Sequence, residues 1–208
     1  PHPGDSFNLG NSTVQFMGPV ILNHDDLNES SLVLRIVFGE TSFLFTGDAG
    51  YESEHAMLEA GYELSSTVLK VGHHGSDSST SYVFLREVSP TYAVISVGAD
   101  NPYGHPSEKV LSRLRDAETT VYRTDLQGDV IALSDGHKVT FRTGKNTSIK
   151  TNPTEKQPEN GTYIGNINSK VFHLPTCTNL PSEKNRIYFA SRREAVEAGY
   201  TPCGNCKP

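Results

Sequence analysis

Long hydrophobic runs are absent from this 208-residue sequence. No stretch approaches the roughly 20 consecutive apolar residues of a membrane-spanning helix, so we expect no membrane span in the chain as given. No segment with the basic, apolar and small-residue parts of a secretory signal opens it. The chain begins Pro1-His2-Pro3-Gly4 without a methionine, which indicates a fragment or a processed product and leaves a lost N-terminal targeting segment open.

Cysteine is scarce and confined to one end of the chain. Three cysteines would leave one thiol over if they formed disulfides. They fall with a histidine as His173-x3-Cys177 and, after 25 intervening residues, Cys203-x2-Cys206. These are two close pairs of the ligands that structural zinc prefers, and a metal would replace part of the core that such a small segment lacks. We predict one structural Zn2+ here, with a disulfide plus a free thiol as the alternative.

Positive charge is in deficit over most of the chain, whose net charge is −6. Residues 1–145 hold 10 Lys and Arg against 19 Asp and Glu, a net −9, whereas residues 146–208 hold 8 against 5, a net +3. An acidic body repels nucleic acid unless bound metal offsets the charge locally. Any general attraction to DNA would therefore come from the tail, where a solvated basic surface is the alternative.

The length of 208 residues suffices for one medium domain plus a small one, or for one larger domain. Residues 144–160 contain almost nothing that builds a core, so they are predicted to be a linker. It would join a domain at 1–143 to a small domain at 161–208. Within the first we expect strands at 13–20, 31–38, 41–45, 66–71, 92–97, 120–123, 130–133 and 138–142, of which the last three close the sheet, and helices at 52–60, 82–88 and 107–114.

Three of these strands end in loops that carry Asp or His. Asp48 follows Thr46-Gly47, His73 and His74 stand between two glycines, and His105 lies in Tyr103-Gly104-His105-Pro106. Such loops are where α/β proteins place chemistry, and divalent transition metals use these ligand types. We predict a catalytic site from these four residues, with solvated loop histidines as the alternative. His55, on the polar side of its predicted helix, is expected at the surface.

The motifs TGDA, KVGHHGS, NPYGHPSEKVLSRL and VYRTDLQGDVIALSDG together resemble the metallo-β-lactamase-like domain of ComEC-type competence proteins, over about residues 1–143. The resemblance implies an α/β fold, an αββα sandwich with metals at one edge, and a hydrolase that cleaves phosphodiester bonds in DNA. It implies that Asp48 bridges Zn2+ or Mn2+ ions, that His74 and His105 are further ligands, and that His73 is a ligand or contacts the transition state. It also suggests a secreted or cell-surface location.

Two departures from this family stand out. Its HxHxDH-like or HxDxDH-like cluster is absent from these 208 residues. We therefore expect the chain to carry the later portion of the domain, and an upstream half of the same domain to complete core and site. In many such hydrolases a metal-binding histidine precedes the strand that begins Ser-Leu-Val-Leu, where Leu27 or Asn28 stands here. His24 is the one histidine nearby.

The tail, residues 162–208, resembles the metal-binding domain of the Ada DNA-repair protein. Cys177, Cys203 and Cys206 match three cysteines of that domain, and His173 replaces the first. In Ada that first cysteine accepts a methyl group from DNA phosphate, so a histidine argues against methyl transfer. A structural or DNA-docking zinc module is implied instead.

Two function classes follow from these patterns. One is a metal-dependent nuclease in a competence or DNA-uptake role. The other is a catalytically incomplete module that binds DNA or a protein, which the missing histidine cluster favours. We adopt the first because the downstream motifs are intact. A lactamase or lactonase would share the fold but gives no reason for a DNA-repair-like tail.

Overall fold

The computed structural model describes residues 1–23, 25–145, 148–152, 163–206 and 208. The chain divides into two compact units, Pro1–Thr154 and Glu155–Pro208. Their boundary falls within the predicted linker 144–160, most of which lies outside the described residues, as does His24. Each unit is described by itself below.

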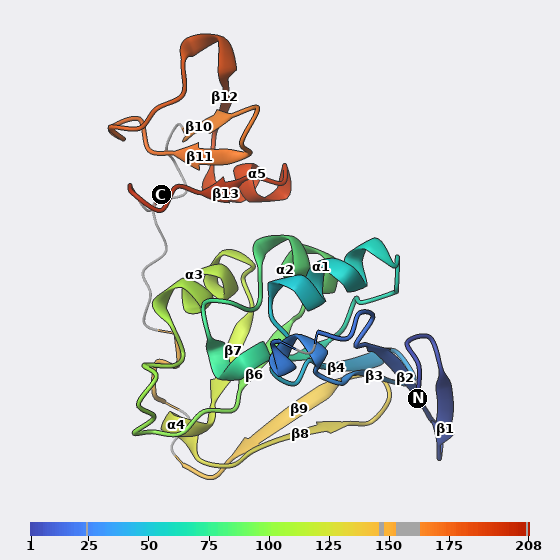
Figure 1. Ribbon diagram of the computed structural model, residues 1–208. Coiled ribbons are helices and arrows are strands. Elements are labelled where there is room, and N and C mark those ends of the chain that lie inside the picture. The colour runs from blue at the N-terminus through green and yellow to red at the C-terminus, as the bar shows by residue number, and fades with distance from the viewer. Residues whose placement is uncertain (24, 146–147, 153–162, 207) are drawn as a thin grey trace. The chain divides into compact units, whose positions relative to one another are not determined.

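A seven-stranded sheet forms the centre of the first unit, with its strands in chain order from β1 to β7 (Figure 1). The strands β1 to β4 pair antiparallel, whereas β4 to β7 pair parallel. Parallel neighbours need a crossover connection, which accounts for the helices between them. The strands are β1 (Ser6–Leu9), β2 (Ser12–Gly18), β3 (Val33–Phe38), β4 (Thr41–Phe45), β5 (Val68–Lys70), β6 (Tyr92–Ile95) and β7 (Thr120–Arg123).

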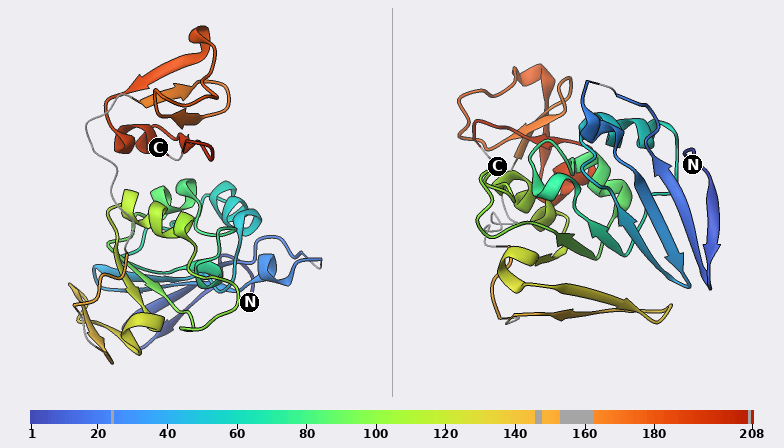
Figure 2. Two further views of the ribbon diagram at one scale, coloured as in Figure 1. Left: turned by 90° about the vertical axis from the view of Figure 1, so that its left-hand side faces the viewer. Right: turned by 60° about the horizontal axis from the view of Figure 1, so that its bottom comes forward.

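Three helices cover one face of this sheet, α1 (Tyr51–Glu59), α2 (Tyr82–Val88) and α3 (Glu108–Asp116) (Figures 1 and 2). The predicted helices are thus present. Serine side chains cap two of them, because Ser81 accepts from the Phe84 N–H and Ser107 from the Val110 N–H. The core between helices and sheet is apolar, and its fully buried members include Leu44, Leu69, Phe84, Leu85, Ile95 and Leu114.

The last two strands of this unit do not join the sheet, so the prediction that they close it was wrong. Strands β8 (Val130–Ser134) and β9 (Val139–Thr143) form a separate antiparallel pair, which follows the short helix α4 (Thr124–Gln127). The Phe141 ring stacks on Tyr122 with centroids 4.1 Å apart and lies 4.9 Å from Tyr92. The hairpin therefore packs across the face opposite the helices rather than along the edge of β7 (Figure 2).

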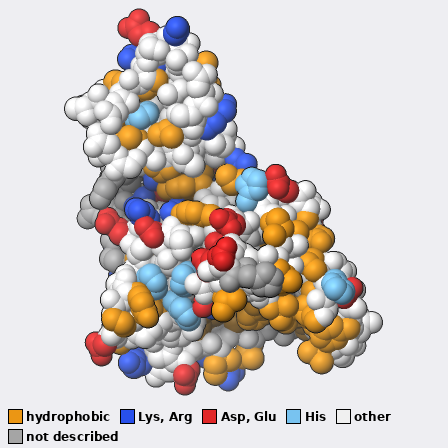
Figure 3. Space-filling model, viewed as in Figure 1, with side chains coloured by type: hydrophobic (Ala, Val, Ile, Leu, Met, Phe, Trp, Pro, Cys, Tyr) orange, Lys and Arg blue, Asp and Glu red, His pale blue; other side chains and the backbone are white. Residues whose placement is uncertain are grey.

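Part of that second face remains open. Strand register places Phe16, Leu34, Ile36, Phe43 and Phe45 on it together, opposite the core side chains. None of the five is in the buried core, and 41% of Phe45 is exposed. Figure 3 shows hydrophobic side chains over the surface beside the N-terminal strands. The sheet thus has one closed apolar face and one that is only half covered.

The second unit is a small four-stranded sheet in the order β12-β10-β11-β13, with one helix. Five buried residues form its core: Tyr163, Phe172, Phe189, Ala195 and Tyr200. Its elements are β10 (Tyr163–Asn166), β11 (Val171–His173), a 3-10 turn at Glu183–Asn185, β12 (Arg186–Phe189), α5 (Arg192–Glu197) and β13 (Thr201–Pro202). Across the described part of both units, no helix has the length and apolar character needed to cross a membrane.

Candidate metal centres

Asp48 and His74 meet at the edge of the sheet where the parallel strands end. Asp48 lies just beyond β4, where its backbone N–H donates to Ser31 Oγ at 3.0 Å. Its Oδ1 lies 3.5 Å from His74 Nε2. The two side chains are 37% and 49% exposed, respectively, so a ligand can reach both. The structure thus brings together two of the four predicted site residues.

His74 is held in an orientation suited to binding a cation. Its Nδ1 lies 2.7 Å from the carbonyl oxygen of Ser96, an atom that can only accept a hydrogen bond. Nδ1 therefore carries a proton, and Nε2 is the ring nitrogen that faces the Asp48 carboxylate. Metal-binding histidines usually donate their other ring N–H in this way. Of the two adjacent histidines, His74 is the better ligand candidate.

The two histidines lie in a strained 3-10 turn, Gly72–Gly75, directly after β5. His73 has φ 46° and ψ 45°, and His74 has φ 53° and ψ 19°, the left-handed region that non-glycine residues seldom occupy. The flanking glycines permit close approach. A Cβ on Gly72 would lie 2.9 Å from the Ala49 carbonyl oxygen, and one on Gly75 would lie 2.7 Å from Pro106 Cβ. Neither position leaves room for a side chain, which accounts for a glycine on each side of the two histidines.

His105 lies closer to His73 than to the Asp48–His74 pair in the contacts that the structure describes. Its ring centroid is 6.0 Å from that of His73 and 5.8 Å from that of Tyr103. Its Nδ1 is buried and has no hydrogen-bond partner among the described residues. Burial lowers the pKa of His105, as does the proximity of His73 and His74, while Asp77 opposes them. Figure 3 shows histidine side chains gathered on the surface of this unit.

The donor set at this edge is incomplete by itself. Among the described residues, Asp48 and His74 belong to no group of three or more His, Cys, Asp or Glu side chains that could hold a metal ion. The two present fit a shared divalent cation, because a carboxylate and an imidazole are ligands that zinc and manganese accept. Such an ion would need further donors.

Lys70 is a member of the site that the sequence patterns did not single out. Its Nζ donates to the Gly47 carbonyl oxygen at 3.2 Å, one residue before Asp48. Burial lowers the pKa of Lys70, whereas the Asp48 carboxylate raises it. The sequence signal that could have identified Lys70 is a lysine at the end of an otherwise apolar strand.

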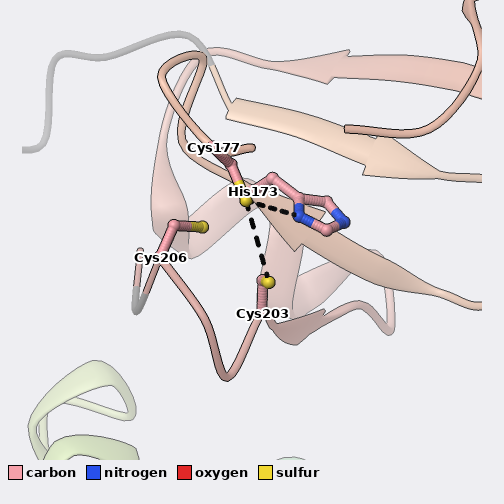
Figure 4. A group of neighbouring side chains, drawn as sticks. All are labelled: His173, Cys177, Cys203 and Cys206. Atoms are coloured by element: carbon pink, nitrogen blue, oxygen red, sulfur yellow. Dashed lines mark hydrogen bonds between the residues drawn. The ribbon is translucent and has the colours of Figure 1, made fainter. Parts of the chain in front are cut away.

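The second centre lies in the tail and contains all four predicted residues (Figure 4). One ligand atom from each of His173, Cys177, Cys203 and Cys206 lies within 4.8 Å of the others. His173 Nδ1 is 3.4 Å from Cys177 Sγ, which is 4.0 Å from Cys203 Sγ. Tetrahedral ligands about 2.3 Å from a zinc ion stand roughly 3.7 Å apart. The cysteines are unpaired, so the disulfide alternative does not describe this structure.

Backbone contacts within the folded tail help to position these ligands. His173 ends β11, and the Cys203 N–H donates to the Phe172 carbonyl oxygen at 2.8 Å. The Leu174 N–H lies 3.4 Å from Cys206 Sγ, to which it donates. Burial, and then the neighbouring sulfur atoms, raise the pKa of Cys206 to about 12. A thiolate at neutral pH therefore requires a cation here, which is what bound zinc supplies.

Comparison with known proteins confirms both resemblances. Residues 3–99 match the metallo-beta-lactamase superfamily, and residues 153–208 match the metal binding domain of Ada. Competence protein ComA of Neisseria gonorrhoeae is 44% identical over 115 residues, which are 55% of this chain and 17% of ComA. ComE operon protein 3 of Bacillus subtilis is 36% identical over 127 residues, 61% of this chain and 16% of that protein.

A further relative is Recombination protein 2 of Haemophilus influenzae, 38% identical over 103 residues, which are 50% of this chain and 13% of that protein. The matched segment thus spans less than a fifth of each relative's length. The chain is thus similar over residues 3–99 to the metallo-beta-lactamase superfamily and over residues 153–208 to the metal binding domain of Ada, and the second segment carries a Cys3His cluster.

Proposed function

We propose that this chain supplies part of a metal-dependent hydrolase that cleaves phosphodiester bonds in DNA during competence. The observation that carries the proposal is the Asp48–His74 pair, with Oδ1 and Nε2 3.5 Å apart and His74 Nδ1 bound to Ser96 O. The competence-related names of the relatives, and the metallo-beta-lactamase match, support the role.

Each residue of the site has a distinct part in the proposal. Asp48 and His74 hold a divalent cation, Zn2+ or Mn2+, which when bound would supply positive charge opposite a phosphodiester and assist attack by water. His105, whose pKa is lowered by burial, offers a buried Nδ1 as a ligand or a phosphate contact. His73 lies against the His105 ring and contacts the same substrate region.

We further propose that the remaining metal donors come from an upstream half of the same domain. Two observations support this: the chain has no HxHxDH-like cluster, and no third donor joins Asp48 and His74 among the described residues. The open apolar face around Phe43 and Phe45 would be covered by the same half. The site therefore reaches full metal affinity only in the completed domain.

The tail is proposed to dock on DNA, with zinc in a structural role. Its net charge is positive, and Lys184 is exposed beside Arg186 on the approach to β12. Tyr188 on that strand is 58% exposed. An exposed aromatic ring next to cations is suited to stacking on unpaired bases while the cations contact phosphates.

Cleavage of linear DNA in the presence of Mn2+ or Zn2+ tests the enzyme proposal, on the chain alone and joined to the upstream residues of its gene. Asp48→Ala removes the carboxylate and should lower cleavage by orders of magnitude. His55→Ala is the matched control, because His55 is 70% exposed and contacts only Glu59 among described ion pairs. Equal activity of wild type and Asp48→Ala would refute the nuclease and leave the binding-module alternative.

A further inference from the structure

The strained turn that carries His73 and His74 is enclosed by the segment that follows it, Ser76–Ser81, here called the serine loop. The cost of a left-handed non-glycine residue is about 1–2 kcal/mol, so two in succession persist only where their surroundings fix them. Ser79, which is fully buried, donates from Oγ to the Gly72 carbonyl oxygen at 2.8 Å and lies 3.1 Å from that of Ser76. The serine loop thus fastens the first residue of the turn, Gly72.

Glu54, on α1, holds the serine loop from one side. It is 3% exposed, and its two carboxylate oxygens accept from the backbone N–H groups of Thr80 and Ser81, the latter at 2.9 Å. Thr80 is itself left-handed, with φ 56°. A buried carboxylate is costly unless hydrogen-bonded. Its two bonds to this loop account for its presence inside the protein.

Arg113, on α3, holds the same loop from a different element. It is 8% exposed, and its Nη1 donates to the carbonyl oxygens of Ser79 at 2.8 Å and Thr80 at 3.3 Å. Its Nη2 donates to the Asp77 carbonyl oxygen at 3.3 Å, and Tyr51 OH donates to that oxygen too. Guanidinium geometry suits it to several acceptors at once, which an ammonium group cannot match.

The order of these elements along the chain shows which site residues each of them adjoins. Helix α1 begins three residues after Asp48, α3 begins three residues after His105, and the serine loop directly follows the turn at His73 and His74. Two buried charges on α1 and α3 therefore tie the loop to the segments that carry the other site residues. We propose that Glu54 and Arg113 are positioning residues, which act through the serine loop to hold the His73–His74 turn against Asp48.

This inference rests on the proposed function for its purpose, but its test does not. Amide hydrogen exchange is measured on the full chain with the zinc-loaded tail. It compares the protection of the His73 and Ser76 amides, which donate to Gly47 O and His73 O respectively, with that of the Val71 amide. The Val71 N–H bonds Val94 O in the neighbouring strand and reports general stability. Arg113→Met should lower protection at His73 and Ser76 about tenfold or more relative to Val71.

The remaining variants separate positioning from a general loss of structure. Glu54→Gln replaces one acceptor oxygen with an amide that cannot accept from Ser81, so it should act in the same direction. Arg113→Lys should restore part of the protection. Arg86→Met is the control, since Arg86 is exposed on α2. Parallel falls at His73, Ser76 and Val71 in both Arg113→Met and Glu54→Gln would overturn the proposal.

Binding of Mn2+ by the same proteins, each joined to the upstream residues of its gene, supplies the second readout. We expect Arg113→Met to weaken binding at the Asp48–His74 pair about tenfold, and Arg86→Met to leave it unchanged. If wild type binds no Mn2+ there, the proposed function fails, while the exchange ratios still decide whether the two charges hold the turn. Unchanged Mn2+ affinity in a folded Arg113→Met protein with altered exchange would refute the part of the proposal that concerns the site.

Discussion

Removal of zinc should unfold the tail and leave the first unit intact. The tail's own core is five residues, one of them Ala195. Structural zinc contributes about 10–16 kcal/mol to zinc-finger peptides at pH 7, as much as the roughly 5–15 kcal/mol that stabilises a whole domain. Without a cation, the raised pKa of Cys206 keeps that thiol neutral, so Cys206 supplies no charge that replaces the metal. We therefore expect a folded tail only in the zinc-bound protein.

The assay combines zinc analysis with two-dimensional NMR of the full chain. Chelation should collapse the amide signals of Phe172 and Cys203 while those of the first unit, such as Leu44, stay dispersed. Cys203→Ser should do the same without a chelator. Thr176→Ala, an exposed position between His173 and Cys177, is the control. A zinc content below about half an equivalent under reducing conditions, or a tail that stays folded after chelation, would refute the reasoning.

Two further predictions concern the first unit. Burial raises the pKa of Glu54 to about 7, against opposing bonds from Ser81 and Thr80 and the charge of Arg113, while Tyr51 lies nearby. The folded state therefore binds a proton more tightly at Glu54 than the unfolded state does, so the free energy of unfolding should fall by roughly 1–3 kcal/mol as pH rises from about 4.5 through 7. Urea titrations at several pH values measure this slope, and Glu54→Gln should flatten it. An unchanged slope in Glu54→Gln contradicts the assignment. Leu114→Ala, at a fully buried position, should lower the free energy of unfolding in urea by about 2–5 kcal/mol. Val83→Ala, at a position that is 42% exposed, should lower it by under about 1 kcal/mol. Similar losses in the two variants would refute the assignment of Leu114 to the core.

Local patterns predicted the elements of the first unit well. Serines ahead of apolar helical spacing located α2 and α3, and continuous apolar runs located β3 to β6. The hairpin β8–β9 was placed in the wrong sheet because its position depends on Phe141 meeting Tyr92 and Tyr122, a contact that strand periodicity does not encode. Strand β1 was not predicted. All of its residues are exposed, so none of them marks a buried face of the strand.

The ligand types were predictable, but their geometry was not. His74 differs from His73 through a bond to Ser96, 22 residues away, and both histidines have left-handed backbone angles that the sequence does not reveal. Glu54 and Arg113 looked like ordinary charges on helix surfaces, because only the folded serine loop gives them partners. The Cys3His cluster was fully predicted, since close spacing within each pair limits where the ligands can lie.

Titration with Mn2+ followed by NMR tests the central claim most directly. In the chain joined to the upstream residues of its gene, a paramagnetic ion at the Asp48–His74 pair should broaden signals of these two residues first, before those of His55, which is exposed on α1. Asp48→Ala should abolish the local broadening while the zinc-loaded tail stays folded. Broadening that is absent at Asp48 and His74, or that persists unchanged in Asp48→Ala, would contradict a metal site at this edge of the sheet.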